Sequence, residues 1–370
     1  MVEWKKLGEV CEILDSKRKP VSKGDRSQGE YPYYGANGIQ DYVDDYIFDG
    51  TFLLLGEDGS VINKDKSPVL HWATGKIWVN HHAHVLSQNE SSLLRYLYYI
   101  LQCTDVSDIV RGVPPKINQA NIRNLVVPIP SLSEQQWIVG ILDTFTSSIE
   151  NLKEQIVQRR KQYEYYRDQL LDLEGKEGVE MKTLGEICIK TSNIRWKTIS
   201  DNEIFKYIDL SSVNRDTHTI DDVLEINKDN APSRAQQIVN RGDIILGTTR
   251  PTLRRYCQIP KQYDNQICST GFCIYRPNTD VVFNRWLFHN IGNWRFWDYC
   301  ELKQQGAGYP CLSNSDAFAY VIPVPPLSEQ QRIVSILDTF EASIRNLEQQ
   351  LALREKQYVY YRKKLLTFNV

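Results

Sequence analysis

Apolar side chains recur at alternating spacings of three and four residues in two long stretches of the chain, residues 131–174 and 326–370. This heptad pattern, sustained over several turns, predicts two long helices that pair through an apolar seam. The seam positions, which include an arginine and a tyrosine in each stretch, are Ile138, Leu142, Phe145, Ile149, Arg159 and Tyr163 in the first and Ile333, Leu337, Phe340, Ile344, Arg354 and Tyr358 in the second.

The two stretches are near copies of each other. Residues 128–171 and 323–366 both contain the motif LSEQQ, and they are identical at most positions when aligned at a spacing of 195 residues. Residues 2–11 and 179–188 form a second, shorter repeat, with K-x-L-G-E in each. A unit of this length that occurs twice indicates a duplicated module, not a solenoid. Packing of the two copies about a pseudo-twofold axis predicts antiparallel helices.

Local signals predict where the long helices begin. Ser133 with Gln136, and Ser328 with Gln331, have the spacing of capping boxes. Arg159 and Arg354 occupy the same seam position in the two copies. A polar residue there either fixes the register of the pair or extends its charged end past the seam to water, and the sequence leaves both interpretations open.

The pattern changes between the helices to short apolar runs bounded by glycine, asparagine and proline. These runs predict strands at 51–56, 76–80, 243–249 and 271–277, and helices at 91–102 and 285–299. The predicted fold class is α+β, with two mixed α/β bodies and two long helices that form an antiparallel coiled coil. The predicted boundaries are residues 1–130 for the first body, 131–174 for the central helix, 175–325 for the second body and 326–370 for the C-terminal helix.

Composition and charge restrict the class of protein. The formal net charge is −2 and the pI about 6.3, which argues against a uniformly basic nucleic-acid coat but allows local basic patches. The eight cysteines include no Cys-x-x-Cys pair, so we expect reduced thiols and no zinc ribbon. The chain has no signal-peptide-like start and no long apolar run, so we expect a cytoplasmic protein without a membrane segment.

Searches for catalytic motifs predict that the chain is not an enzyme. The sequence contains no phosphate loop of the G-x-x-x-x-G-K-[ST] type, no G-x-S-x-G elbow and no Asn-Pro-Pro-aromatic tetrapeptide. The HHAH run at residues 81–84 is the one candidate for metal ligation. A metal needs further ligands, and few other histidines exist, so structural packing is favoured and no metal site is predicted.

Loops with interleaved basic and aromatic residues are the candidate DNA contacts. Such side chains can hold phosphates and read base edges, although a single loop of this kind is also typical of a solvated surface. The candidates are Lys17, Arg18, Lys19, Tyr34 and Asn37 in the first body and Arg195, Trp196, Lys197, Arg250, Arg254 and Arg255 in the second. Segments 111–122 and 306–317, which share a proline in register, either touch DNA or lead the chain into the long helix.

The doubled LSEQQ-x-I-V-x-I-L-D motif, with K-x-L-G-E opening each half, resembles the specificity subunit of a type I restriction-modification system over essentially the whole chain. The resemblance implies that each body is a target-recognition domain for half of a bipartite sequence in double-stranded DNA. It implies that the two helices form a spacer and dock two modification (methyltransferase) subunits. It also implies that restriction subunits, which translocate and cleave DNA, join the complex.

The same resemblance places S-adenosylmethionine, ATP and Mg²⁺ in the partner subunits and no cofactor in this chain. The variable loops transfer no base-contacting residue by motif. Two other interpretations remain open: a specificity module of a type IIB-like restriction enzyme, and a coiled-coil adaptor whose bodies bind protein.

Overall fold

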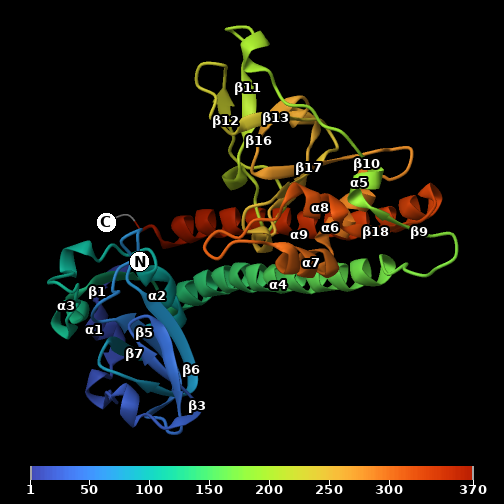
Figure 1. Ribbon diagram of the computed structural model, residues 1–370. Coiled ribbons are helices and arrows are strands. Elements are labelled where there is room, and N and C mark those ends of the chain that lie inside the picture. Colours follow the sequence, from blue (N-terminus) through green and yellow to red (C-terminus); the bar gives the residue numbers. More distant parts are fainter. Residues whose placement is uncertain (1, 369–370) are drawn as a thin grey trace. The chain divides into compact units, whose positions relative to one another are not determined.

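The computed structural model describes residues 2–368, which form two compact units (Figure 1). Unit 1 comprises Met1–Lys153 and Gln349–Val370, and unit 2 comprises Glu154–Glu348. The predicted long helices are confirmed as α4 (Leu132–Leu170) and α9 (Leu327–Leu366). The units divide both helices, whereas the sequence boundaries treat each helix as a segment of its own. Each unit therefore contains one body and one segment of each long helix.

The body of unit 1 is built on a six-stranded sheet with the order β2-β7-β5-β6-β3-β4. Its strands are β2 (Cys11–Ile13), β3 (Gln28–Gly35), β4 (Gly38–Val43), β5 (Phe48–Gly56), β6 (Leu70–Val79) and β7 (Ala83–Gln88). The helices are α1 (Leu7–Val10), α2 (Leu94–Leu101) and α3 (Gln119–Asn124), with 3₁₀ turns η1 (Asp15–Lys17), η2 (Lys23–Asp25) and η3 (Ser107–Ile109). The strands predicted at 51–56 and 76–80 and the helix predicted at 91–102 are confirmed.

One core joins this body to the long helices. Helix α2 buries an apolar face against Ile138 and Leu142 of α4, and Leu366 of α9 belongs to the same cluster. Figure 1 shows α2 beside the start of α4. Because burial of each such side chain stabilises the fold by roughly 1.5–3 kcal/mol, the helix segments are part of the unit's core.

The body of unit 2 has two four-stranded sheets, with the orders β10-β17-β14-β15 and β12-β11-β16-β13. The first contains β10 (Cys188–Ile189), β14 (Ile244–Gly247), β15 (Tyr256–Gln258) and β17 (Phe272–Pro277), and the second contains β11 (Phe205–Ile208), β12 (Leu224–Ile226), β13 (Ala235–Val239) and β16 (Gln266–Ser269). Shorter elements are α5 (Leu184–Ile187), α8 (Asn314–Ala319), η4 (Trp196–Thr198), η5 (Leu210–Ser212), η6 (Pro251–Leu253) and η7 (Lys261–Tyr263). The strands predicted at 243–249 and 271–277 are confirmed.

The single helix predicted at 285–299 is wrong, because the structure has two helices there. Helix α6 (Asn284–Gly292) ends before Asn293, and α7 (Trp294–Lys303) begins after it. Asn293 has an extended backbone, and its side chain accepts a hydrogen bond from the N–H of Arg295 (2.9 Å). An asparagine in this N-cap role starts a new helix, although the apolar spacing continues across it. Both helices pack in a core with Ile333 and Leu337 of α9.

The segments of α4 and α9 run antiparallel within each unit. In unit 1, Phe145 stacks on Tyr361 at a ring distance of 5.3 Å, and Lys153 further along α4 pairs with Glu355. In unit 2, Tyr166 stacks on Phe340 at 5.4 Å. The aromatic pairs occupy corresponding positions of the two repeats, as the pseudo-twofold prediction requires.

A two-stranded sheet closes each body at the base of a long helix. Strand β1 (Glu3–Lys6) pairs with β8 (Val126–Ile129), and β9 (Glu180–Thr183) pairs with β18 (Val321–Val324), both antiparallel. The glutamate of each K-x-L-G-E motif accepts a hydrogen bond from a backbone N–H three residues earlier, Glu9 from Lys6 and Glu186 from Thr183. The repeated opening thus caps the short helix that follows the first strand of each body.

The predicted helix starts are wrong by one or two residues. Ser133 and Ser328 lie inside the helices, and the N–H of Glu134 instead donates to the hydroxyl of Ser131 (3.3 Å). In α9 the carbonyl of Pro326 accepts the corresponding backbone bond from Glu329. The capping-box spacing matched the sequence, but the prolines before each motif allow the helix to begin earlier. Among the described helices, none combines the length and apolar character that a membrane span requires.

Candidate nucleic-acid interface

Two loops of unit 1 are hydrogen-bonded to each other at the edge of the body. Residues 57–60 follow β5, and residues 111–117 precede α3. The backbone bonds run from Gly59 N–H to Pro115 O (2.9 Å), from Ile117 N–H to Glu57 O (2.8 Å) and in both directions between Arg111 and Lys116 (2.9 and 2.7 Å). We call these segments loop pair 1.

Unit 2 has the same arrangement after β14, in residues 248–254 and 305–312. The backbone bonds run from Arg250 N–H to Pro310 O (2.7 Å), from Leu312 N–H to Thr248 O (2.9 Å) and in both directions between Gln305 and Cys311 (2.9 and 2.8 Å). We call these segments loop pair 2. The hydrogen bonds match those of loop pair 1 one for one, and the second hairpin is one residue longer. The duplication therefore includes this part of the bodies, although the side chains of the two loop pairs differ.

The tips of the two loop pairs carry exposed apolar side chains of different kinds. Val113 is fully exposed in loop pair 1, and Tyr309 is 72% exposed in loop pair 2. A conserved backbone frame with different exposed side chains is the arrangement expected of a surface that selects different ligands in each body.

The loop pairs also differ in charge. In loop pair 1, Lys116 pairs with Glu57 (3.2 Å), so part of its positive charge is neutralised. In loop pair 2, Arg250 and Arg254 are exposed, and each lies over an aromatic ring, Tyr309 at 4.4 Å and Trp297 at 5.8 Å. Within the described part of the chain, neither arginine has a carboxylate within 4 Å. Loop pair 2 therefore presents the more positive surface.

Arg255, a third predicted contact, is engaged inside the body. Its guanidinium donates to the carbonyl oxygens of Leu210 (2.5 Å) and Val213 (3.3 Å). These bonds tie β15 to η5 and leave the side chain only partly exposed. The structure assigns Arg255 a role in the fold, which its neighbour Arg254 does not share.

Arg18 is likewise engaged with the protein. Its side chain is 11% exposed, it pairs with Asp15 (3.4 Å) and Glu57 (2.5 Å), and it donates to the carbonyl of Ala83 (2.9 Å). Because Glu57 begins loop pair 1, Arg18 fixes the basic loop beside that element. Lys17 and Lys19 remain exposed on the same loop.

The same cluster includes a histidine of the HHAH run. His84 is buried between Asp15 (2.6 Å) and the carbonyl of Ile117 (2.8 Å), whereas His82 pairs with Asp58. The side chains of Asp15, Glu57 and His84 lie close enough together to hold a cation. Arg18 pairs with both carboxylates and Lys116 pairs with Glu57, so the cluster supplies its own cationic partners. This agrees with the packing interpretation.

Electrostatics support this assignment. Burial raises the pKa of Asp15, but the hydrogen bond from His84 and the charge of Arg18 outweigh it, so the net pKa lies below the usual value. Asp15 also accepts a hydrogen bond from Gln119 (3.0 Å), in the helix after loop pair 1. The ionised carboxylate of Asp15 therefore links the basic loop to His84, which contacts Ile117 of loop pair 1, and to Gln119 just after that loop pair.

The remaining two candidates of the first body, Tyr34 and Asn37, differ in their exposure to solvent. Tyr34 is buried in β3, packs in a core cluster with Phe48 and Leu54, and burial raises its pKa. Its ring is part of the core and not of the surface. Asn37 is exposed in the turn between β3 and β4.

Arg195, Trp196 and Lys197 lie apart from loop pair 2 in the fold of the second body. Trp196 is half-buried against Phe205, and its indole N–H donates to the carbonyl of Ala235 (2.8 Å). This anchors η4 to the sheet of β11, β12, β13 and β16, whereas loop pair 2 follows β14 of the other sheet. Arg195 and Lys197 are exposed on either side of the anchored tryptophan.

The predicted seam residues of the long helices are largely buried. Ile138 and Leu142 of α4 and Ile333 and Leu337 of α9 are buried in the cores that join the bodies to the helices, so they pack on the bodies as well as along the helices. Ile149 and Ile344 are also buried, and the others are half-buried: Phe145, Arg159, Tyr163, Phe340, Arg354 and Tyr358. Arg354 lies over the ring of Phe145 (5.6 Å) and donates to Gln357, so it stays in the seam and covers an aromatic face. Arg159 lines a groove with Phe340, the corresponding ring of the other repeat.

Sequence reasoning missed the buried glutamine of each LSEQQ motif. Gln135 accepts hydrogen bonds from Ser92 (3.0 Å) and the N–H of Leu93 (2.9 Å) and donates to Pro130 (2.9 Å). Gln330 accepts from the N–H of Phe283 (3.0 Å) and donates to the carbonyls of Val281 and Pro325. Each amide therefore fixes the start of a long helix to the start of a body helix. The repetition of the motif was the available signal.

A second repeated contact lies about two helical turns further along each long helix. Arg95 of α2 pairs with Asp143 of α4 (2.7 Å), and Arg285 of α6 pairs with Asp338 of α9 (2.7 Å). In unit 2 the buried His289 also contacts Asp338 (3.0 Å). These contacts hold each body rigidly on its helix segments.

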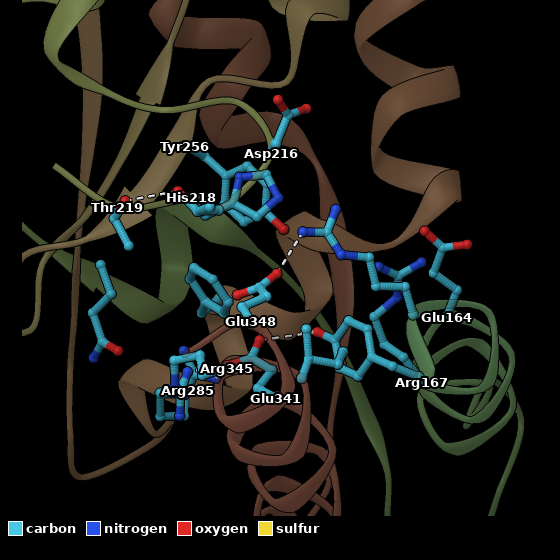
Figure 2. Close-up of a pocket in the computed structure, with 16 residues that line it drawn as sticks. Glu164, Arg167, Asp216, His218, Thr219, Tyr256, Arg285, Glu341, Arg345 and Glu348 are labelled. Atoms are coloured by element: carbon cyan, nitrogen blue, oxygen red, sulfur yellow. Dashed lines mark hydrogen bonds and ion pairs between the residues drawn. The ribbon is translucent and has the colours of Figure 1, made fainter. Parts of the chain in front are cut away.

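A cavity of about 450 Å³ in unit 2 lies between the loop around His218 and the long helices (Figure 2). Its charged side chains pair with one another: Arg160 with Glu348 (2.6 Å), and Arg285 with Glu341. His218 stacks on Tyr256 at 4.1 Å, and burial lowers its pKa to about 4. The positive and negative side chains that line the cavity therefore pair with one another, between a loop of the body and the helix segments.

Comparison with known proteins agrees with this architecture. The family model for the type I restriction modification DNA specificity domain matches residues 1–159 and 176–354. A putative type I restriction enzyme specificity subunit of Haemophilus influenzae is 32% identical and aligns with 100% of this chain and 96% of its own length. The EcoR124I/EcoR124II specificity subunit of Escherichia coli is 29% identical, with 99% and 94% covered.

A solved structure supports the fold. The crystal structure of the type I restriction-modification S subunit from M. genitalium matches with a TM-score of 0.67 at 16% identity, over 100% of this chain and 97% of that one. Two matched domains, two loop pairs and two long helices define a duplicated DNA-specificity architecture. The chain belongs to the type I restriction-modification DNA specificity family.

Proposed function

We propose that this chain recognises a two-part sequence in double-stranded DNA, one part with each body, as the specificity subunit of a type I restriction-modification complex. The observation that supports this most directly is the pair of corresponding loop pairs, which share a backbone frame and differ in exposed side chains. The rigid contacts of each body with the helix segments suit a reader that must hold each half-site in a defined place.

The surfaces available for DNA are local and positive. Lys17, Lys19, Arg250 and Arg254 are exposed basic residues on or beside the loop pairs. They suit contacts with phosphates, which provide affinity, and with base edges, which provide sequence selection. The net charge of −2 implies that partner subunits supply much of the remaining positive surface.

The long helices are the proposed docking surface for two modification subunits, with restriction subunits joining the complex. Their outer faces carry large apolar side chains, including the exposed Trp137 of α4 and Leu353 of α9. S-adenosylmethionine, ATP and Mg²⁺ belong to the partner subunits in this proposal, which gives this chain no catalytic residue. The absence of phosphate-loop and methyltransferase motifs from the sequence supports that division.

The decisive experiment expresses the chain with its modification subunits in a host without adenine methylation and maps methylated adenines across the genome. We expect one motif of two short parts separated by unspecified bases of fixed number. A single uninterrupted motif, or the same methylation pattern without this chain, contradicts the proposal.

A gel-shift series separates the DNA reader from the protein-binding adaptor. We expect weak binding of a target duplex by the chain alone, and tighter, salt-sensitive binding with the modification subunits. The double variant Arg250→Ala, Arg254→Ala should weaken binding by the complex, whereas an adaptor would be indifferent to it. Equal affinity with and without the modification subunits would contradict the proposed division of contacts.

A further inference from the structure

We propose that Arg250 reads the edge of a guanine in the half-site of the second body, and that Tyr309 orients its guanidinium for this contact. The inference rests on the proposed function and adds the base type and the residue that selects it. It follows from three observations on loop pair 2: the backbone conformation, the ring contact and the absence of a carboxylate partner.

The backbone at Arg250 is left-handed, with φ of 49°. The corresponding residue of loop pair 1 is Gly59, which makes the same hydrogen bond to a proline carbonyl and has φ of 80°. Both bodies therefore need a left-handed residue at this position, and glycine adopts that conformation without strain. Unit 2 has an arginine there in spite of the strain, which indicates that its side chain is needed.

The side chain of Arg250 is held in place without being neutralised. Its guanidinium carbon lies 4.4 Å from the ring centre of Tyr309, and the tyrosine itself is 72% exposed. Within residues 2–368 no carboxylate lies within 4 Å of it. The engaged arginines differ, since Arg276 pairs with the buried Asp243 and Arg18 pairs with Glu57. The guanidinium of Arg250 thus keeps its donors available in a fixed plane.

A fixed plane suits a bidentate contact with a base edge. Two parallel N–H groups of arginine match O6 and N7 of guanine in the major groove, which is the most common specific contact of this side chain. A phosphate also accepts two N–H groups of arginine, but it carries no sequence information, so selection at one base pair distinguishes the two contacts. The first body has Gly59 at the position of Arg250, so this arginine contact is confined to the second half-site.

The test uses the complete complex with its modification subunits and genome-wide mapping of methylated adenines. For the unaltered chain we expect a G·C pair at one defined position of the second half-site. Arg250→Lys should lower discrimination at that position by about tenfold to a hundredfold and leave the first half-site unchanged. Retention of full discrimination by Arg250→Lys would overturn the inference, because charge alone would then suffice.

Two further variants separate recognition from folding. Arg250→Gly restores the residue type of loop pair 1, so we expect a thermal midpoint at or above that of the unaltered chain together with relaxed selection at the same base pair. Unchanged selection in this stable variant would overturn the inference. Arg241→Ala is the matched control, since Arg241 is exposed at the opposite end of β14 and its loss should not alter the motif.

The role of Tyr309 is one of positioning and has its own test. Tyr309→Leu should relax selection at the same base pair, and Tyr309→Phe, which keeps the ring, should restore it. Equal selection by the unaltered chain, Tyr309→Leu and Tyr309→Phe would show that Tyr309 does not orient Arg250. A two-part motif that contains no G·C pair in its second half would refute the reading of guanine. A motif that is not two-part would refute the proposed function itself, so the two failures are distinguishable.

Discussion

The arginines predicted to contact DNA differ in what their charges already contact. Arg18 and Arg255 complete the interior, one against buried carboxylates and the other against backbone carbonyls. Arg250 and Arg254 lie over aromatic rings at the surface. Substitutions at these positions should therefore separate into effects on folding and effects on DNA binding.

Removal of Arg18 should destabilise unit 1. Arg18→Ala leaves Asp15 with one cationic partner fewer in a buried site, which is expected to cost about 3 kcal/mol of unfolding free energy or more. Lys17→Ala, on the same loop but exposed, should change it by less than about 0.5 kcal/mol. Urea unfolding of both variants measures the difference, and equal stabilities would contradict the internal role of Arg18.

The buried imidazole in the cavity of unit 2 should make that unit sensitive to acid. Burial lowers the pKa of His218 to about 4, against 6.5 for the ordinary side chain. The unfolded chain therefore binds the proton more readily, and the stability of unit 2 should fall as the pH drops from 6.5 towards 4. Glu341 and Asp216, which attract the protonated ring, and Arg160, which repels it, face His218.

Thermal unfolding between pH 7 and pH 5 measures this dependence. His218→Asn should reduce the loss of stability over that range, because asparagine accepts the left-handed backbone and has no proton to bind. His81→Asn, at an exposed position of unit 1, is the control and should leave the dependence of unit 2 unchanged. An unaltered slope in His218→Asn would assign the acid sensitivity to other groups.

At the scale of the elements, the first glutamine of each LSEQQ motif joins a long helix to a helix of the body. Gln135 and Gln330 each satisfy backbone groups at the starts of two helices, which would otherwise remain unpaired in the interior. The fold itself therefore requires this glutamine in both copies of the motif, whether or not a partner binds there.

Replacement of this glutamine should loosen the attachment of a body to its helix. Gln330→Ala leaves the N–H of Phe283 and two carbonyls without their partner, which is expected to cost about 1–3 kcal/mol. Gln331→Ala, the next residue, loses an exposed contact with Ser335 and should cost less than about 0.5 kcal/mol. Hydrogen exchange at the start of α6 gives the most direct measurement, and similar protection in both variants would contradict this role.

Much of the fold could be predicted from periodicity, because the seam of a long helix is repeated many times. The long helices were predicted in this way, their antiparallel pairing from the duplication, and the main strands from short apolar runs bounded by turn residues. The break at Asn293 was not, since a single side-chain cap interrupts the helix without changing the apolar spacing. The helix starts were misplaced because an earlier residue already accepts the first N–H groups, through the hydroxyl of Ser131 in α4 and the carbonyl of Pro326 in α9.

The interface was less predictable, because the state of each charged side chain depends on distant partners. Arg18 pairs with Glu57, and Arg255 donates to Leu210, both far along the chain. Loop composition could identify basic residues but not which of them are engaged. Tyr309 was overlooked because its neighbour in space, Arg250, belongs to another loop.

At the scale of the whole molecule, the last residues of the chain complete its first unit. Leu366 is buried in the core cluster of unit 1, and Tyr358 donates to Gln102 of the same unit (3.3 Å). Unit 1 therefore cannot reach its full stability until the C-terminal helix has been synthesised.

Point variants at the end of α9 test this dependence. Leu366→Ala should destabilise unit 1 by about 2–5 kcal/mol, as expected for a buried leucine. Leu353→Ala, on the same helix but exposed, should have little effect. Hydrogen exchange in α2 gives the readout for unit 1, and equal protection in both variants would show that the C-terminal residues do not support that unit.

The strand pairs β1·β8 and β9·β18 have a consequence for how such genes change. Each pair places the entry and the exit of a body side by side, from Glu3 opposite Ile129 and from Glu180 opposite Val324. The repeated motifs K-x-L-G-E and LSEQQ lie next to those same two points. Exchange of the segment between the repeats would therefore replace a complete body and keep its closing strands intact.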